Sequence, residues 1–417
     1  MNNISKIFLI RKAVLFIKNP FYVISTVYYL IEKFFIKHGI IKKKKKKLII
    51  IDDLFPHPIS AFRFSEYLQY LEEIKDVHIY TTGNTLSSIH QENDITSVIK
   101  AFKKNYPSHR NKVSVFNPHQ YLQADLAYLI FLDNAYSYLH LFEKQKIPFV
   151  FTLYPGGGFF LNNNKVNKHL SSIFNSSLFR KVIVTQIISL DYLIKNNFCP
   201  INKISFIYGA VLPTNIYGHG KYVRKIFGED KTVLDVCFVA NKQMKGGIDK
   251  GFDVFMEVAN IYKNYSAISF HVVGPFTKMD SQFNNLKNVD YYGMLETINL
   301  KSFLNKMDII LSPNKPFILR EGAFDGFPTA SCTEASLMGV AMFITDFLKL
   351  NLHYTHMEDV VIIDGKIENI KEKIDYFLDN PMLLAQLSKK GKAKTEEIFS
   401  IQNQVGKRLD ILGEFIK

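Results

Sequence analysis

The chain has 417 residues, of which 47 % are hydrophobic and 22 % charged, and a formal net charge of +14. This length predicts two domains rather than one, and the apolar content argues against a chain that is disordered throughout. The three cysteines, Cys199, Cys237 and Cys332, are widely spaced and lack histidine partners at metal-binding spacing. They argue against a disulfide framework or a zinc site and indicate a reducing cytoplasm.

Most of the positive charge lies in the first 47 residues. Residues 1–47 hold twelve Lys and Arg against one acid, Glu32, a net +11 that leaves +3 for the remaining 370 residues. The longest apolar run, 20–31, has twelve residues, whereas a helix needs about 20 to cross a bilayer. A cleaved signal peptide fits poorly, because Lys18 interrupts the apolar part and no small-residue cleavage site follows.

We therefore predict that residues 1–47 form a basic extension that binds the inner face of the cell membrane. Its aromatic side chains would enter the headgroup boundary, and the six lysines of 42–47 would attract anionic lipid. A solvated tail without a partner is an alternative. Nucleic-acid binding is a weaker one, because the lysine run lacks interleaved aromatics and no reading motif accompanies it. The prediction is thus a cytoplasmic, peripheral membrane protein that binds no nucleic acid.

From residue 48 onward, strand and helix patterns alternate. Residues Phe64, Tyr67, Leu68, Leu71 and Ile74 recur at helical spacing after the first strand. Continuous apolar runs predict buried parallel strands, at 48–51, 77–80, 126–132, 149–153, 182–185 and 204–207. A doubly wound parallel sheet is therefore expected for a first domain over 48–214.

The stretch DDLFPHPISAFR, at 52–63, follows the first strand. Arg63 is a candidate phosphate contact, and Ser60 is a candidate cap for the following helix. His57 lies between two prolines and is expected to be exposed. Asp52 and Asp53 have either a structural role or a role toward an acceptor.

A second polar turn follows the strand at 149–153, in PFVFTLYPGGGF at 148–159. It presents Tyr154 and three glycines, Gly156, Gly157 and Gly158. Glycines at the carboxyl end of a strand allow backbone to approach a ligand, although they could equally form a flexible turn. These residues are candidates for the acceptor and phosphate side of a site.

The pattern lapses over 208–231, which we interpret as an interdomain linker, and then restarts. Strand-like runs lie at 233–239, 268–273, 289–292, 308–311, 340–344 and 360–363. Helical segments fall at 251–264, 297–306, 329–338, 367–378 and 381–398. The second doubly wound domain is therefore assigned to 215–398, and an amphipathic helix is expected at 401–416. Ligands of such sheets bind beyond the carboxyl ends of the strands, so two facing domains place a cleft between them.

Two segments of the second domain suit a phosphate-containing ligand. In VCFVANKQMKGGIDKGFDVF, 236–255, a buried strand ends at Ala240 and Lys250-Gly251 opens an amphipathic helix. In EGAFDGFPTASCTEASLMG, 321–339, Gly326 permits close backbone approach and Pro328 suits the first position of a helix. The amino end of that helix is suited to phosphate. Glu334, about two turns into it, can accept two hydroxyl hydrogen bonds, as a ribose offers.

Residues 308–339 closely resemble the donor-site signature of glycosyltransferase family 4, whose members have the GT-B fold of two Rossmann-like domains facing across a cleft. The signature has an acidic residue, Gly-Phe-Pro, Glu-Ala and a later Gly. The matching residues are Asp325, Gly326, Phe327, Pro328, Glu334, Ala335 and Gly339. The family usually has seven residues between its two acids, and this chain has eight, so a bulge or Glu321 would restore the geometry.

The resemblance implies roles for these residues. Glu334 would bind the donor ribose, and Asp325 or its neighbours would contact the donor sugar. The backbone amides of 326–330, which include Thr329 and Ala330, would lie near the diphosphate. Lys250 and Lys242, the latter with Lys245 as a competitor, would neutralise the departing diphosphate.

The resemblance also covers the first domain and the chain end. Relatives often have a histidine that touches the reacting sugar where this chain has Tyr154, and His140 is a remote candidate to replace it. In GT-B proteins the last helix commonly braces the first domain, which is expected here of residues 399–417.

The reaction implied is a retaining transfer of a sugar from a nucleotide-sugar donor, without a cofactor. No Asp-x-Asp motif lies beside the candidate donor site, so no metal is expected. The basic extension suggests a glycan or lipid-linked acceptor of lipopolysaccharide or cell-surface polysaccharide biosynthesis. The alternatives are a GT-B nucleotide-sugar epimerase and a non-catalytic GT-B-like scaffold at the membrane. A dehydrogenase is unlikely, because no Gly-x-Gly-x-x-Gly opens a helix after an early strand.

Overall fold

The structure, a computed structural model, describes residues 30–31, 34–36, 45–86, 94–118, 120–217 and 224–417. The extension predicted at 1–47 therefore lies almost entirely outside the described residues. Its last two lysines, Lys46 and Lys47, already belong to the first strand. Among the helices of the described part, none is both long and apolar enough to cross a membrane.

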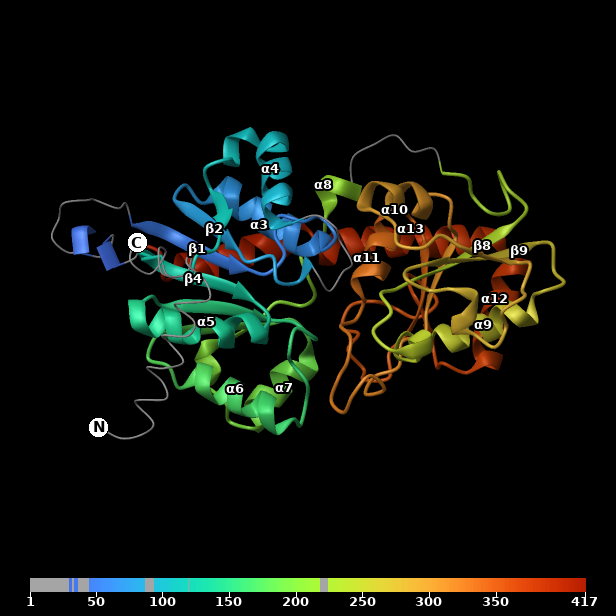
Figure 1. Ribbon diagram of the computed structural model, residues 1–417. Coiled ribbons are helices and arrows are strands. Elements are labelled where there is room, and N and C mark those ends of the chain that lie inside the picture. The colour runs from blue at the N-terminus through green and yellow to red at the C-terminus, as the bar shows by residue number, and fades with distance from the viewer. Residues whose placement is uncertain (1–29, 32–33, 37–44, 87–93, 119, 218–223) are drawn as a thin grey trace.

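The first domain is a parallel sheet covered by helices on both faces (Figure 1). Its strand order is β3-β2-β1-β4-β5-β6-β7. The strands are β1 (Lys46–Asp52), β2 (Val77–Thr81), β3 (Val113–Val115), β4 (Ala124–Ile130), β5 (Phe149–Leu153), β6 (Phe179–Val184) and β7 (Ile204–Phe206). The helices are α3 (Ala61–Glu73), α4 (Ile95–Asn105), α5 (Leu132–Gln145), α6 (Asn164–Phe174) and α7 (Ile187–Lys195).

The second domain repeats this design with the order β10-β9-β8-β11-β12-β13. Its strands are β8 (Leu234–Val239), β9 (Ile268–Val273), β10 (Val289–Tyr291), β11 (Ile309–Ser312), β12 (Ala341–Thr345) and β13 (Val361–Ile363). Its helices are α9 (Phe252–Ile261), α10 (Thr297–Leu304), α11 (Ala330–Leu337), α12 (Ile367–Asp379) and α13 (Pro381–Ile398). Both doubly wound sheets are thus confirmed, and the strands are mainly apolar, as expected where helices cover both sheet faces.

Three details differ from the sequence prediction. The strand β3 was missed, because three residues are too few for a visible period. The run 126–132 was predicted as one strand, but β4 ends at Ile130 and α5 begins at Leu132. The amphipathic helix predicted at 401–416 is divided into a π-helical turn, Gln402–Gly406, and α14, Lys407–Gly413.

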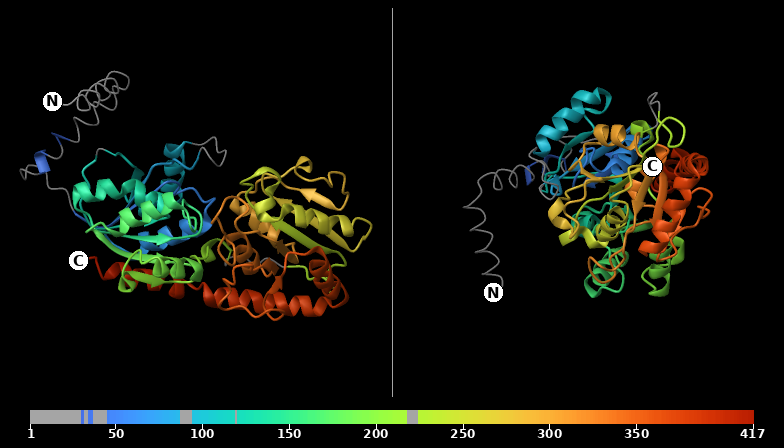
Figure 2. Two further views of the ribbon diagram at one scale, coloured as in Figure 1. Left: turned by 90° about the horizontal axis from the view of Figure 1, so that it is seen from below. Right: turned by 90° about the vertical axis from the view of Figure 1, so that its right-hand side faces the viewer.

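The chain returns to the first domain after α13, as the left panel of Figure 2 shows. Val405, Ile411 and Leu412 of this returning segment pack in the core cluster of the first domain. Arg408 is fully buried, with its Nε 3.7 Å from Glu66 Oε1. The C-terminal segment therefore fastens the second domain to the first.

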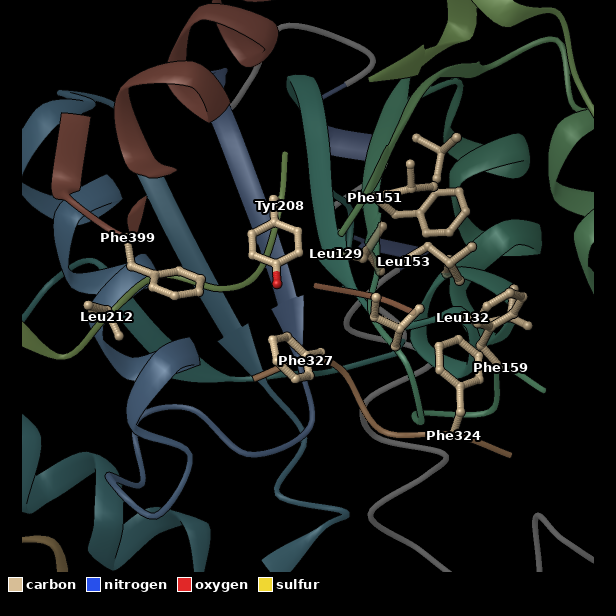
Figure 3. Close-up of a cluster of buried hydrophobic side chains, with 14 of the residues drawn as sticks. Leu129, Leu132, Phe151, Leu153, Phe159, Tyr208, Leu212, Phe324, Phe327 and Phe399 are labelled. Carbon is tan, nitrogen blue, oxygen red and sulfur yellow. The ribbon is translucent and has the colours of Figure 1, made fainter. Parts of the chain in front are cut away.

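A hydrophobic cluster joins the two domains at the cleft (Figure 3). Phe324 and Phe327 of the second domain lie among apolar side chains of the first. The rings of Phe159 and Phe324 are 6.1 Å apart in an edge-on contact. Apolar contacts with the first domain, as well as contacts within the second domain, thus hold the segment 320–327 in place.

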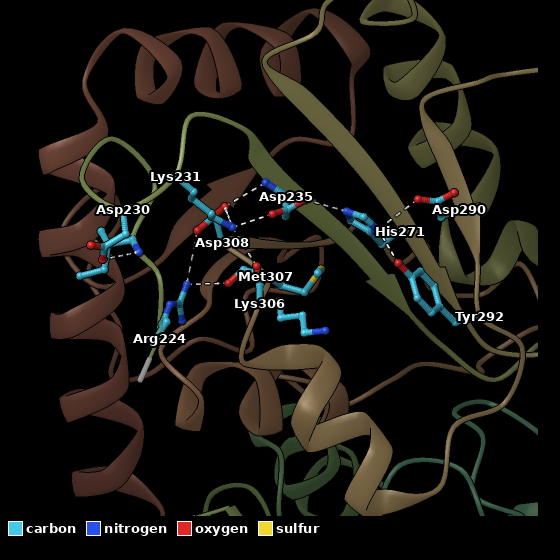
Figure 4. A network of polar contacts seen from close by, with 11 residues as sticks. Arg224, Asp230, Lys231, Asp235, His271, Asp290, Tyr292, Lys306, Met307 and Asp308 are labelled. Atoms are coloured by element: carbon cyan, nitrogen blue, oxygen red, sulfur yellow. Dashed lines mark hydrogen bonds and ion pairs between the residues drawn. The ribbon is translucent and has the colours of Figure 1, made fainter. Parts of the chain in front are cut away.

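Residues 224–235 are bound to the second domain at the amino ends of its strands (Figure 4). Arg224 donates to the carbonyls of Met338 and Met307, at 2.8 and 2.6 Å. Lys231 Nζ lies 2.7 Å from Asp308 Oδ2, which also accepts from the Asp235 amide. Residues from Arg224 onward therefore belong to the second domain, although the predicted linker extended to 231.

Candidate active site

A cavity of about 180 Å³ lies between the two domains. Its first-domain wall comes from the carboxyl ends of strands and includes Phe131 after β4, Tyr154 after β5, and Thr185 and Gln186 after β6. Its second-domain wall comes from the segment between β11 and α11 and from α11 itself. Residues of that wall are Asp325, Gly326, Pro328, Thr329, Ala330, Thr333 and Glu334.

The segment between β11 and α11 is held tightly against the first domain. The Leu161 amide donates to the Gly322 carbonyl at 2.9 Å, and a Cβ at Gly322 would lie 1.9 Å from Leu161 O. A Cβ at Gly326 would lie 3.1 Å from Nε2 of Gln186. The amide of Phe327 donates to Gln186 Oε1 at 3.3 Å. Glycine is therefore needed at Gly322, where backbone of the other domain approaches, whereas a larger residue at Gly326 would require the Gln186 side chain to shift.

The helix α11 starts slightly later than predicted. Thr329 is its N-cap, and the Thr329 hydroxyl accepts from the Cys332 amide at 3.4 Å. Pro328 precedes the cap instead of occupying the first helical position. Glu334 is the fifth residue of Ala330–Leu337, so it lies about one turn into the helix and not two. Its side chain consequently lies near the amino end of α11, at the cavity.

Glu334 is half-buried and lines the cavity. The Tyr217 hydroxyl donates to its Oε2 at 3.2 Å. Desolvation raises the pKa of Glu334 to about 7, although the hydrogen bond from Tyr217 acts in the opposite direction. An ionised carboxylate here is therefore costly without a ligand, and hydroxyl donors of a bound ligand would lower that cost.

Glu334→Gln is expected to raise protein stability at pH 8 and to leave it unchanged at pH 5. Because the folded-state pKa is raised, the wild-type protein gains stability as pH falls through about 7 toward the unfolded value of 4.5. The neutral amide removes this dependence. The gain at pH 8 should be on the order of 1 kcal/mol, or about 2–4 °C in Tm. Thermal unfolding at both pH values measures it, with the exposed Glu257→Gln as a control; equal Tm differences at both pH values would contradict the prediction.

Lys250 and Asp325 form an ion pair at the edge of the cavity. Lys250 Nζ donates to Asp325 Oδ1 at 2.9 Å and Oδ2 at 2.7 Å. Asn314 Nδ2 donates to Asp325 Oδ2 at 2.7 Å. Lys250 is 9 % exposed, and its ammonium also lies 3.6 Å from Asp249 Oδ2. Burial raises the pKa of Asp249. A single lysine thus faces two carboxylates.

The position of Lys250 depends on Gly251. Gly251 has a φ of +74° and is the N-cap of α9. A Cβ at Gly251 would lie 2.1 Å from Pro313 O, so the start of α9 and the end of β11 approach closely. Any larger residue would push apart the two segments that bring Lys250 to Asp325.

The other predicted donor-side residues lie elsewhere. Lys242 Nζ donates to both oxygens of Asp280, at 3.0 and 3.1 Å, and lies over the Phe276 ring. Glu321 is exposed and does not line the cleft cavity. Lys245 is also exposed. Of these three lysines, Lys250 is the one that contacts the segment between β11 and α11, through Asp325.

The predicted first-domain residues are mostly engaged in internal contacts. The Tyr154 ring lines the cavity, but its hydroxyl donates to Glu66 and accepts from Arg408 Nη2 at 3.1 Å. Arg63 donates to Asp53 at 2.5 Å and to Asp52 at 3.3 Å, so both carboxylates already neutralise it. A tyrosine hydroxyl and an arginine bound in this way are not free to meet phosphate.

The remaining first-domain expectations are corrected by the local packing. Ser60 occupies the N-cap position of α3 but accepts from Arg63 Nε at 3.1 Å and makes no cap hydrogen bond. His57 is half-buried, not exposed, because its Nδ1 accepts from the Ile59 amide. His140 is exposed on α5 and does not line the cavity.

The triple glycine serves packing at two of its three positions. A Cβ at Gly157 would lie 2.2 Å from the Phe131 ring, and one at Gly158 would lie 2.1 Å from the Asp133 carboxylate. Gly156 has open space around it. The turn therefore brings the backbone against the start of α5, and only Gly156 has an unobstructed approach.

The site includes residues that sequence reasoning missed. Thr185 ends the strand predicted at 182–185 and Gln186 follows it, so their position at a carboxyl end was the available signal. The Thr185 hydroxyl is buried and has no hydrogen-bond partner within the described part of the chain. Asn314 follows β11 in the same way. Tyr217 gave no signal, because it lies in a stretch without a period.

Metal ligands are not gathered at this site. Within the described ranges, no group of three or more His, Cys, Asp or Glu side chains is close enough together to hold a metal ion. Lys250 is a cationic side chain at the edge of the cavity, where it binds Asp325 of the segment between β11 and α11.

Comparison with known proteins agrees with this architecture. A family model described as glycosyl transferase-like matches residues 256–410. No curated protein sequence is significantly similar to the chain. A glycosyltransferase from Rickettsia africae is similar in structure, at 15 % identity over 90 % of this chain and 100 % of that chain, with a TM-score of 0.59.

Two further solved structures share the fold. HepE of Anabaena, in complex with UDP and glucose, has 13 % identity over 88 % of this chain and 99 % of that chain, with a TM-score of 0.61. Sucrose-phosphate synthase of Thermosynechococcus elongatus has 11 % identity over 89 % and 99 %, with a TM-score of 0.57. At these identities the likeness establishes the fold, which is GT-B.

The fold and the cleft define a protein of the GT-B class. Residues 256–410, in the second domain and the returning C-terminal segment, match the glycosyl transferase-like family, and this match together with the GT-B fold supports a transferase enzyme.

Proposed function

We propose that this enzyme moves a sugar from a nucleotide-diphosphate donor, with retention of the anomeric configuration and without a metal, to a glycan or lipid-linked acceptor. The observation that carries the proposal is the convergence of Glu334 and the Lys250–Asp325 pair on one interdomain cleft. UDP is the first nucleotide to test, because HepE of Anabaena was solved with UDP and glucose.

Each group has a chemical task in this proposal. Glu334 accepts hydrogen bonds from the ribose hydroxyls. The amino end of α11 and the Lys250 ammonium face the diphosphate and stabilise the negative charge that develops as the sugar–phosphate bond breaks. Lys250 has three donor hydrogens, and two of them point to Asp325. Asp325 lines the cavity and is placed to accept from hydroxyls of the donor sugar.

The acceptor proposal rests on the basic extension at 1–47. A lipid-linked acceptor of lipopolysaccharide or cell-surface polysaccharide synthesis would lie at the inner face of the membrane, where that net +11 segment would hold the enzyme. Sedimentation with anionic and with neutral vesicles tests this, using the full chain and a variant lacking residues 1–44.

Nucleotide binding tests the donor site directly. A panel of nucleoside diphosphates and nucleotide sugars should include at least one that raises Tm of the wild-type protein, because a ligand that binds only the folded state stabilises it. Glu334→Ala should lose most of that shift, since the ribose contact is removed. Absence of any shift across the panel would instead favour a non-catalytic scaffold.

Activity is expected to survive chelation. The rate of sugar transfer is measured with about 5 mM EDTA, an excess over trace metal, and in untreated buffer. The two rates should agree within about twofold, because Lys250 and the amino end of α11 provide the positive charge that a metal would otherwise supply. Loss of activity in EDTA, restored by manganese, would overturn the metal-independent mechanism but not the donor site.

A further inference from the structure

Tyr217 lies on the segment that connects the two domains. It is the last residue of α8, Thr214–Tyr217, and its side chain is buried. The preceding linker residues Tyr208 and Leu212 pack in the cluster that joins the domains (Figure 3). Tyr217 is therefore connected by a short stretch of chain to the interdomain contact.

The hydroxyl of Tyr217 holds one oxygen of the candidate ribose-binding carboxylate. It donates to Glu334 Oε2 at 3.2 Å. Tyr217 lines a different cavity, of about 570 Å³, which lies at the carboxyl end of α11, and it does not line the cleft cavity. It thus reaches Glu334 from outside the cleft cavity, which leaves the carboxylate able to face a ligand there.

Few other ionisable groups face Glu334. In the cleft cavity these are Asp325, which is bound to Lys250, and Tyr154, whose hydroxyl is bound to Glu66. The charged groups at the carboxyl end of α11 line the second cavity: Arg224, Glu229, Asp308, Lys389 and Lys392. Among the described cations, none forms an ion pair with Glu334, so Tyr217 is the polar group that orients it.

We propose that Tyr217 is a positioning residue that orients the Glu334 carboxylate for the donor ribose and links donor binding to the interdomain segment. The proposal rests on the proposed function, in which Glu334 binds the ribose. Loss of the hydroxyl removes a donor to the carboxylate, and the pKa of Glu334 then rises further above its ordinary value.

The test compares Tyr217→Phe with Tyr262→Phe. Tyr262 is the matched control, because it is also buried and its hydroxyl donates to a carboxylate, Asp375 Oδ1, at 2.7 Å, on the outer helices of the second domain. UDP affinity is measured from pH 5.5 to 9 on the full chain. The midpoint for Tyr217→Phe should move to higher pH, with affinity about three- to tenfold weaker at pH 7 and near wild type at pH 9.

The outcomes separate the two proposals. Glu334→Gln, measured in parallel, should bind UDP weakly at every pH; if it binds as wild type does, the proposed function fails. If Glu334→Gln binds weakly while Tyr217→Phe follows the wild-type curve, only the role of Tyr217 is overturned. The pH dependence of Tm gives the same comparison without ligand, because the fall in stability with rising pH should extend to higher pH in Tyr217→Phe than in wild type or Tyr262→Phe.

Discussion

Replacing Lys250 with alanine is expected to lower kcat by about 100- to 1000-fold, with a smaller change in KM for the donor. The Lys250 ammonium lies 2.7 Å from Asp325 Oδ2 beside the cleft, and among the described residues no Lys or Arg lines the cleft cavity itself. Charge that develops on the diphosphate in the transition state would lose its nearest side-chain partner. Steady-state kinetics with the nucleotide sugar found by the binding panel measures the effect.

Two further variants show whether the fall in kcat is specific to Lys250. Lys315→Ala is the matched control, because Lys315 also pairs with an aspartate, Asp253 Oδ2, at 2.6 Å on a nearby exposed surface. Its kcat should stay within about twofold of wild type, as expected for an exposed pair. Lys242→Ala should have an intermediate or small effect, because Asp280 binds Lys242. A Lys250→Ala protein with wild-type kcat and Tm would contradict the assignment.

Replacing Arg408 with alanine is expected to destabilise the protein by about 3–5 kcal/mol, because it leaves a buried carboxylate without its cation. Arg408 and Glu66 are both fully buried. Glu66 also accepts from the hydroxyls of Tyr70, Tyr128 and Tyr154. The returning C-terminal segment should detach from the first domain, and urea or thermal unfolding would detect this.

A double variant separates lost charge pairing from lost packing. Arg408→Met with Glu66→Gln removes both charges, so it should recover a large part of the stability lost in Arg408→Ala. Lys181→Ala is the control for the same contact between segment and domain, since Lys181 of β6 forms a partly exposed pair with Glu414 of the returning segment, and it should change stability by less than about 1 kcal/mol. Equal stability of Arg408→Ala and wild type would show that the segment is held by its apolar contacts alone.

The fold was predictable because its signals are local and repeated. Each apolar run from 48–51 to 360–363 is short and continuous, and such a run is buried on both faces only in a parallel sheet covered by helices. Thirteen strands are described, and the one that gave no sequence signal, β3, has three residues. Helix starts were less accurate, as at Thr329, because capping depends on side-chain contacts.

The candidate site was predictable only in part. Motif and position in the sequence singled out Gly326, Gly251 and Glu334. In the structure, other segments approach closely at Gly251 and Gly326, and Glu334 lines the cleft cavity. Tyr154 and Arg63 were expected to face ligand, but buried partners bind their polar groups. A sequence shows which residue types follow a strand, but not which of their atoms are already bound.

The sequence by itself determined two doubly wound sheets and the segments that end at the cleft, because hydrophobic period and strand length are properties of neighbouring residues. Only the tertiary structure decided which polar groups meet there. Lys250 and Asp325 are 75 positions apart, and Tyr217 and Glu334 are 117 apart. Such pairs form because tertiary packing fixes the distances between segments, and no local pattern encodes those distances.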